Sequence, residues 1–239
     1  MSQLALPLQL ADHAVFASFF AKGNETLIAT LTNMAGGRPS NPDGHGCWMW
    51  GAAASGKTHL LQAVCEMAGD RSTYVPLATL APAGPQIIDG LATRDLICID
   101  DVDTVAGQEA WEAALFALCN QVQDAGVDLI ISATSAPRES PFKLEDLKSR
   151  FAKLPVFQVH DLDDDERLLA LQLRSAHRGL ELPDDTAQYL LKRSRRDMAS
   201  LYDLLDTLDR EALRAKRRLT IPFVRSVLEG SESGASKPT

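Results

Sequence analysis

The chain has 239 residues, 45% of them hydrophobic, which suits one α/β domain with a sizeable core and a small second domain. Lys and Arg number 24 against 32 Asp and Glu, so the formal net charge is −8. Tight binding to phosphate backbones needs a clustered positive field, so we expect no direct sequence-specific DNA binding and favour a protein partner. No apolar run approaches the roughly 20 residues of a membrane span, and no secretory signal begins the sequence. We therefore expect a cytoplasmic protein without a membrane partner.

The four cysteines are far apart in the sequence and form no CxxC pair: Cys47, Cys65, Cys98 and Cys119. No histidine lies near them at zinc-site spacing, so a metal site or a disulfide framework has little support. Core packing is the favoured interpretation.

Short apolar runs alternate with longer amphipathic segments up to residue 160. Before them come an apolar arm over 1–12, helices over 14–20 and 25–34, and a polar loop over 36–45. The predicted strands are 47–50, 73–77, 96–99, 129–133 and 156–159, and the helices between them 57–67, 109–125 and 144–151. Such alternation predicts a three-layer α/β domain over 13–160, with a five-stranded parallel sheet covered on both faces.

Residues 161–230 are predicted to form a small all-helical domain. Acidic residues from Asp163 cap a first helix that runs to Arg178, and Gly179 ends it. Three further helices are predicted over 183–193, over 197–217 and from 220 onward. The small polar residues 231–239 are expected to be a disordered tail.

The strongest motif is GAAASGKT over 51–58, a GxxxxGK[ST] pattern between a predicted strand and a predicted helix. In this pattern, backbone N–H groups cradle phosphates at the helix amino terminus, the lysine reaches the β and γ oxygens, and the threonine ligates Mg²⁺. A merely structural glycine turn would not need Lys57 followed by Thr58. The candidate contacts to ADP or ATP are Gly51, Ser55, Gly56, Lys57, Thr58 and the adjacent His59.

The second half of such a site is an apolar strand that ends in acids. Leu96–Ile99 is followed by Asp100 and Asp101. Asp100 would hold Mg²⁺ through water, and Asp101 would orient or deprotonate an attacking water. Capping of the next element is the alternative role for such a pair, and the first motif makes it the weaker one.

The first motif, the acid pair and LKSRF at 147–151 together resemble the DnaA-type initiator clade of AAA+ proteins, and the resemblance runs from about residue 3 to 228. It implies that Arg150 is an arginine finger, which enters a neighbouring subunit's γ-phosphate site. The alternative is a surface arginine paired with Glu145 or Asp146.

Two sensor positions depart from the clade. Ser135 stands where the initiators commonly have Asp at the end of a strand. Ala199 stands where the lid carries a sensor arginine, and Arg195 or Arg196, one turn earlier, could substitute. A missing sensor arginine implies a diphosphate-bound state with weak hydrolysis. The clade also implies adenine recognition around Phe16, Phe19, Phe20, Gly23 and Asn24, although these phenylalanines could equally be core residues.

The amino-terminal arm resembles a peptide that binds the sliding clamp, the β subunit of DNA polymerase III. Its amide and apolar anchors are Gln3, Leu4, Leu6, Pro7 and Leu8. Packing of the arm on the protein's own sheet is the alternative. Only a short polar tail follows the predicted lid, so we expect no helix-turn-helix domain.

The arm and this expectation make the chain similar to regulatory inactivators of DnaA. Such proteins bind ADP, dock on the DNA-loaded clamp and stimulate ATP hydrolysis by DnaA. An arginine finger also implies head-to-tail contacts, in a homodimer or a longer oligomer. The competing hypotheses are a small nucleotide kinase, which would need an arginine-rich lid, and a loader or initiator paralogue that acts on DNA or a helicase.

Overall fold

The computed structural model describes residues 14–37, 46–193 and 198–234. These residues form two compact units. Among the described residues, 14–16 and those from 21 to 161 belong to the amino-terminal unit, and 17–20 and those from 162 onward belong to the carboxy-terminal unit.

The amino-terminal unit is built on a five-stranded parallel sheet in the order β2-β3-β4-β1-β5. The strands are β1 Gly46–Trp50, β2 Ser72–Pro76, β3 Leu96–Asp100, β4 Asp128–Ala133 and β5 Val156–Gln158. Each boundary lies within one residue of the sequence prediction, and the predicted parallel sheet is confirmed. The central strand β4 pairs with β3 and β1, which brings the ends of β3, β4 and β1 to one edge of the sheet.

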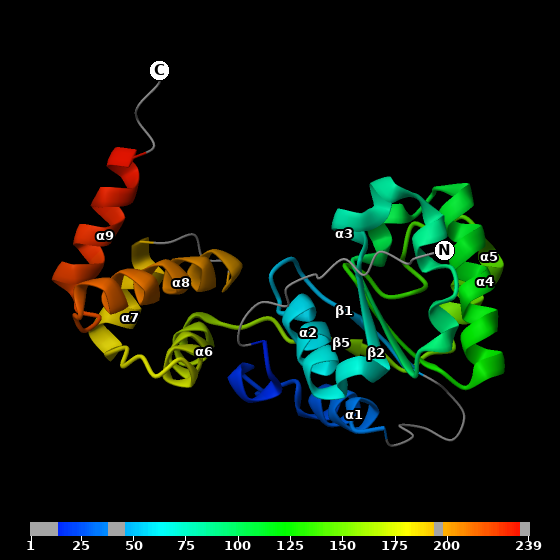
Figure 1. Cartoon of the computed structure of the whole chain (residues 1–239), viewed down its shortest axis with the longest axis horizontal. Helices are drawn as coiled ribbons and strands as arrows, with labels where there is room; N and C mark the ends of the chain where they lie inside the picture. Colours follow the sequence, from blue (N-terminus) through cyan, green and yellow to red (C-terminus); the bar gives the residue numbers. More distant parts are fainter. Residues whose placement is uncertain (1–13, 38–45, 194–197, 235–239) are drawn as a thin grey trace. The chain divides into compact units, whose positions relative to one another are not determined.

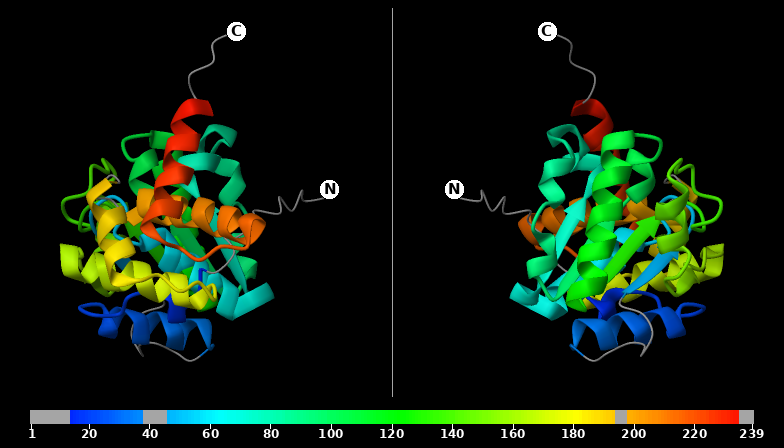
Figure 2. Two further views of the ribbon diagram at one scale, coloured as in Figure 1. Left: turned by 90° about the vertical axis from the view of Figure 1, so that its left-hand side faces the viewer. Right: turned by 90° about the vertical axis from the view of Figure 1, so that its right-hand side faces the viewer.

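Helices cover both faces of this sheet, which confirms the predicted three-layer arrangement (Figure 1). One face carries α1 (Glu25–Ala35) and α2 (Lys57–Ala68), and the other carries α4 (Glu109–Ala125) and α5 (Glu145–Phe151). The right-hand view of Figure 2 looks onto the face that α4 covers. Because parallel strands are buried on both faces, every residue of β3 is buried.

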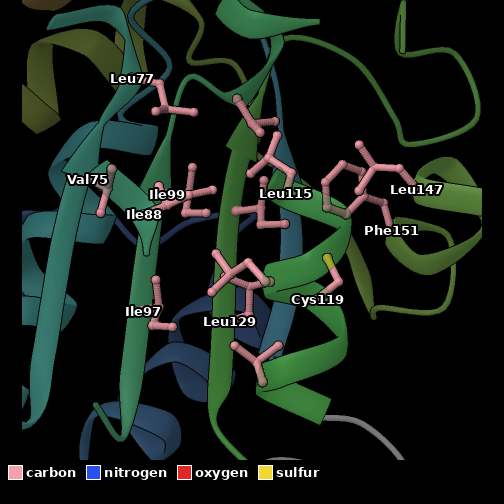
Figure 3. Packing of buried hydrophobic residues seen from close by; sticks show 14 of the residues in the cluster. Val75, Leu77, Ile88, Ile97, Ile99, Leu115, Cys119, Leu129, Leu147 and Phe151 are labelled. Atoms are coloured by element: carbon pink, nitrogen blue, oxygen red, sulfur yellow. The ribbon is translucent and has the colours of Figure 1, made fainter. Parts of the chain in front are cut away.

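The core under α4 and α5 is continuous from the sheet to both helices (Figure 3). Leu115 and Cys119 of α4 face strand residues such as Ile99 and Leu129. Phe151 of α5 packs its ring 5.0 Å from Trp48 and 5.4 Å from Phe142, measured between ring centroids. All four cysteines are free and buried, in agreement with the core-packing interpretation.

The predicted helix over 14–20 is wrong, because only Phe16–Ser18 form a single 3₁₀ turn. Tertiary contacts replace helical hydrogen bonds in this segment. The Val15 carbonyl oxygen lies 3.0 Å from His59 Nε2, and Phe20 packs in the core of the carboxy-terminal unit. Gly23 then turns the chain with a φ of 77° before α1 begins.

The segment between β2 and β3 carries short helices that the periodicity of the sequence does not predict. They are α3 (Leu77–Leu80) and the 3₁₀ turns Ala81–Ala83, Pro85–Ile88 and Leu91–Thr93. Gly84 and Gly90, both at positive φ, break the segment into turns too short for helical periodicity. Leu77, Ile88 and Leu91 nevertheless enter the main core.

The carboxy-terminal unit consists of α6 (Asp164–His177), α7 (Asp184–Arg193), α8 (Met198–Ala215) and α9 (Ile221–Gly234), coloured from yellow to red in Figure 2. Asp163 begins α6 with a capping box, since its side chain accepts from Glu166 N at 2.8 Å and Glu166 Oε2 accepts from Asp163 N at 3.1 Å. Helix α9 continues to Gly234, past the expected start of the tail at residue 231, because Ser and Glu extend a formed helix at small cost. No helix among the described residues is long and apolar enough to cross a membrane.

Candidate functional site

The phosphate-loop motif lies between the end of β1 and the start of α2. Ala54 and Gly56 both take positive φ, 61° and 97°, which turns successive N–H groups of the loop toward one side. Gly51 leaves room for this turn, because a Cβ there would lie 3.0 Å from Ser55 Oγ and 3.2 Å from the Val159 carbonyl oxygen. The loop thus has the concave backbone that binds an anion at a helix amino terminus.

Lys57, the first residue of α2, is buried beneath this loop and only 6% exposed. Its Nζ donates to the carbonyl oxygens of Gly51 at 2.9 Å and Ala52 at 2.8 Å. Burial lowers the pKa of this ammonium group, while the charges of Asp101, Asp100 and Asp103 act in the opposite direction. The lysine is therefore held at the phosphate loop and faces the acids at the end of β3.

Buried polar atoms without a hydrogen-bond partner occur within the loop and just before α1. The Ser55 Oγ atom is buried and has no hydrogen-bond partner among the described residues. The same holds for Asn24 Nδ2, whereas Asn24 Oδ1 accepts from His160 N at 2.9 Å. Thr58 is exposed, and His59 contacts the Val15 carbonyl. A phosphate and an adenine ring would supply the missing hydrogen-bond partners.

Asp100 ends β3 and is 2% exposed. Tyr74 Oη donates to Asp100 Oδ2 at 2.7 Å, and Ser132 Oγ donates to Asp100 Oδ1. Ser132 Oγ in turn accepts from Asp101 N at 2.9 Å. Burial and the neighbouring carboxylate raise the pKa of the Tyr74 phenol, so it stays a donor. Sequence reasoning missed Tyr74 and Ser132; the available signal for Ser132 was a polar residue at the end of an apolar run in β4.

Asp101 stands at a strained position at the end of the same strand. Its φ of 54° and ψ of 49° are left-handed, a conformation that non-glycine residues seldom adopt. Burial raises the pKa of its carboxyl, and so does the charge of Asp100, while Lys57 lowers it. Both predicted acids are thus close to the lysine of the phosphate loop.

Asp103 extends the acidic group, because its charge acts on both Lys57 and Asp101. Thr134 Oγ1 donates to Asp103 Oδ2. Ser135, the residue predicted as a sensor, accepts a hydrogen bond from Trp48 Nε1 through its backbone oxygen at 3.0 Å. The hydrogen bonds from the end of β4 to the acids come from Ser132 and Thr134. The sensor role of Ser135 remains a prediction.

Arg150 lies on α5 at the surface that α5 shares with α4. Its Nη1 donates to Gln123 Oε1 at 2.5 Å, and its guanidinium carbon lies 6.0 Å from the centroid of the Phe116 ring. Glu145 pairs with Lys148 at 3.4 Å. The arginine is thus bound to α4 by a neutral group, and not to Glu145 or Asp146 as the alternative interpretation held.

Glu112, near the start of α4, holds the segment that leads into α5. Its carboxylate accepts from the backbone N–H groups of Gly107 at 2.6 Å, Lys143 at 3.0 Å and Leu144 at 2.6 Å. Burial acts to raise the pKa of this carboxyl, but the three backbone donors outweigh it, and the pKa is lowered. Sequence reasoning gave this residue no role.

Several candidate residues lie outside the described part of the chain. They are Arg195 and Arg196 of the lid and the five arm residues Gln3, Leu4, Leu6, Pro7 and Leu8. Their predicted roles remain predictions.

Comparison with known proteins gives one family match, over the carboxy-terminal unit. Residues 164–228 match the family described as Hda, lid domain. The match covers α6, α7 and α8 in full and α9 up to Leu228.

Solved structures with a similar fold extend over both units. Domain III of the replication initiation protein DnaA from Thermotoga maritima has a TM-score of 0.73 at 20% identity, over 91% of this chain and 96% of that one. AMPPCP-bound DnaA from Aquifex aeolicus has a TM-score of 0.63 at 20% identity, over 82% of this chain and 66% of that one. The RuvB Holliday junction branch migration motor of Thermotoga maritima has a TM-score of 0.55 at 16% identity, over 86% and 66%.

The fold is therefore that of an AAA+ P-loop protein, with a parallel five-stranded sheet followed by a helical lid. Residues 164–228 match the lid domain of the Hda family, and the fold is similar to that of DnaA domain III, in agreement with the resemblance that the sequence motifs indicate.

Proposed function

We propose that this protein is a cytosolic negative regulator of DNA replication initiation, which binds ADP and promotes hydrolysis of the ATP bound to DnaA. The match of residues 164–228 to the Hda lid, on an AAA+ fold like that of DnaA, carries this proposal. In the proposed action the protein docks on the DNA-loaded sliding clamp and presents Arg150 to the nucleotide of DnaA.

The phosphate loop supports the nucleotide part of the proposal. The N–H groups of 51–58, the Lys57 ammonium and the unpartnered Ser55 Oγ would hold the phosphates, and Asn24 Nδ2 would face the base. Thr58 and Asp100 would hold Mg²⁺, which neutralises phosphate charge when bound. The AMPPCP in the Aquifex aeolicus DnaA structure favours an adenine nucleotide as the ligand.

Slow hydrolysis by the protein itself follows from one feature of the sequence. Ala199 occupies the position that the clade gives to a sensor arginine. A group that detects the γ-phosphate is thus absent at this position, which favours retention of ADP.

Replacement of Ala199 by arginine tests this account of slow turnover. We expect Ala199→Arg to raise the rate of ATP hydrolysis by the isolated protein at least severalfold, because it adds a cation at the sensor position. Release of radiolabelled phosphate in single-turnover reactions measures the rate, and Ser200→Arg, one residue further along α8, is the matched control. An unchanged rate in Ala199→Arg would refute this account of the slow turnover.

Arg150 would act on the ATP of DnaA. In that reaction water oxygen bonds to the γ-phosphorus, the bond to the bridging β–γ oxygen breaks, and ADP and inorganic phosphate leave, with a proton released from the water. The guanidinium would stabilise the negative charge on the transferring oxygens, an effect worth about 10³ to 10⁵ in rate for arginine fingers supplied in trans. The hydrogen bond to Gln123 supports this role, because a neutral partner leaves the positive charge of Arg150 intact.

The decisive experiment measures ATP hydrolysis by purified DnaA in the presence of DNA-loaded clamp. The protein, Arg150→Ala and a version lacking residues 1–8 are added in separate reactions. We expect strong stimulation of ATP hydrolysis by the intact protein. Arg150→Ala should give no stimulation, and the truncated protein should give no clamp-dependent stimulation. No stimulation by the intact protein would refute the proposed function.

A further inference from the structure

Arg150 belongs to a small structural unit that α4 and α5 form together. At one end, Glu112 of α4 binds the N–H groups of Lys143 and Leu144, and Leu144 immediately precedes α5. At the other end, Phe151 of α5 is fully buried in the core against Trp48. The backbone of α5 is therefore fixed on both sides of Arg150, and only the arginine side chain retains freedom.

Gln123 restrains this side chain. It lies on the outer part of α4, is exposed, and accepts the hydrogen bond from Arg150 Nη1 at 2.5 Å. The Phe116 ring, two turns earlier on the same helix, lies beneath the guanidinium at 6.0 Å. An arginine side chain carries about 2 kcal/mol of rotamer entropy, so these two contacts select one orientation from many.

The chemistry of this hydrogen bond suits a side chain that must act elsewhere. A guanidinium has five N–H donors in a rigid fork, and the amide oxygen of Gln123 accepts from Nη1, so most of the fork stays available. The amide is neutral, so it orients the guanidinium without neutralising its charge. A carboxylate at the same place would form an ion pair and compete with a phosphate for the arginine.

We propose that Gln123 is a positioning residue that holds Arg150 in the orientation in which it enters the nucleotide site of the partner. This inference rests on the proposed role of Arg150 as an arginine finger. Gln123 itself touches neither the nucleotide nor the reacting atoms, and it acts through the arginine alone.

The test is the stimulated hydrolysis of DnaA-bound ATP, measured over a range of concentrations of the regulator. We expect Gln123→Ala to lower the maximal rate about 3- to 10-fold, because the freed arginine side chain regains rotamer entropy. The concentration that gives half-maximal stimulation should change less than about twofold, since docking does not depend on this bond. Alanine is the best helix former, so the substitution should leave α4 folded.

Gln121→Ala is the matched control, because it removes the same side chain from another exposed position of α4. It should leave both the maximal rate and the half-maximal concentration unchanged. In an Arg150→Ala background, Gln123→Ala should have no further effect, because the two residues act as one unit.

Gln123→Glu separates orientation from charge. The carboxylate keeps an acceptor but forms an ion pair with Arg150, so we expect a reduced maximal rate. Salt screens this ion pair, so the rate of the variant relative to the wild type should recover as the salt concentration is raised.

An unchanged maximal rate in Gln123→Ala, with Arg150→Ala still inactive, would overturn the positioning role and leave the proposed function intact. A faster rate in Gln123→Ala would also overturn it, by showing that Gln123 restrains the arginine. Full stimulation by Arg150→Ala would instead refute the arginine finger itself.

Discussion

Two carboxyl groups of the amino-terminal unit, the buried Glu112 and the half-buried Asp101, have pKa values that shift in opposite directions. Glu112 accepts hydrogen bonds from three backbone N–H groups, and its pKa is lowered from 4.5. Asp101 sits in a strained left-handed conformation beside Asp100, and its pKa is raised from 3.8. The carboxylate with a structural role has its hydrogen-bond partners within the protein, whereas the charged form of the carboxylate at the candidate ligand site is less stabilised.

The phosphate loop resembles Asp101 in having strained or incompletely hydrogen-bonded groups. Ala54 is strained, Ser55 Oγ has no partner among the described residues, and Lys57 is buried with a lowered pKa. A ligand that brought phosphates and Mg²⁺ would offset all three. Substitutions in this region should therefore change ligand binding more than folding stability, and substitutions at Glu112 should do the reverse.

The largest effect is expected at Lys57. Lys57→Ala should weaken ADP–Mg²⁺ binding about 100-fold, or about 2.7 kcal/mol, because it removes the only charged group that the loop directs at the phosphates within residues 51–58. Titration calorimetry measures the affinity. Lys153→Ala, at an exposed position of the same unit, should bind ADP as the wild type does.

The same Lys57→Ala protein should unfold in urea within about 1 kcal/mol of the wild type when no nucleotide is present, because burial already opposes the charged form of Lys57. A large loss of stability with unchanged ADP affinity would reverse the comparison and make Lys57 a scaffold residue.

Glu112→Gln should act on stability instead. The amide can accept through one oxygen only and presents N–H groups to other N–H groups, so we expect a loss of about 2 kcal/mol in the free energy of unfolding at pH 7. Urea titration of the nucleotide-free protein measures it, and Glu109→Gln, an exposed acid in the first turn of α4, is the control. ADP affinity should be unchanged, and a loss of affinity with normal stability would contradict the scaffold role.

The pH dependence should distinguish the two carboxyl groups. The folded-state pKa of Glu112 is lowered, so its stabilisation is full above its unfolded value of 4.5 and is lost as the pH falls through the folded value. For Asp101 the folded pKa is raised, so any stabilisation from its protonated form is lost as the pH rises through that value. The free energy of unfolding should therefore differ less between pH 7 and pH 4 in Glu112→Gln than in the wild type, as measured by urea titration at both pH values.

The sequence predicted the features that depend on local pattern along the chain. It did not predict the side-chain contacts that depend on which strands pair and which helices pack together. Strand spacing, the phosphate loop and the acid pair at 100–101 follow from local pattern and were found. Ser132 reaches Asp100 only because β3 and β4 pair in one register, and Gln123 meets Arg150 only because α4 packs on α5. The short helices after β2 are held by core contacts of Leu77 and Ile88, which periodicity does not reveal.

The smallest effect is expected at Ala54, and it should have the opposite sign. With a φ of 61°, this alanine holds a conformation that costs an L residue roughly 1 kcal/mol and a glycine almost nothing. Part of the gain is lost to the greater freedom of glycine in the unfolded chain, so Ala54→Gly should stabilise the nucleotide-free protein by about 0.5 kcal/mol. Thermal unfolding measures this, with Ala53→Gly as the control, since Ala53 has no positive φ and should lose stability. Equal destabilisation by both substitutions would mean that the loop is not strained before the ligand arrives, and that the comparison with Glu112 rests on charge alone.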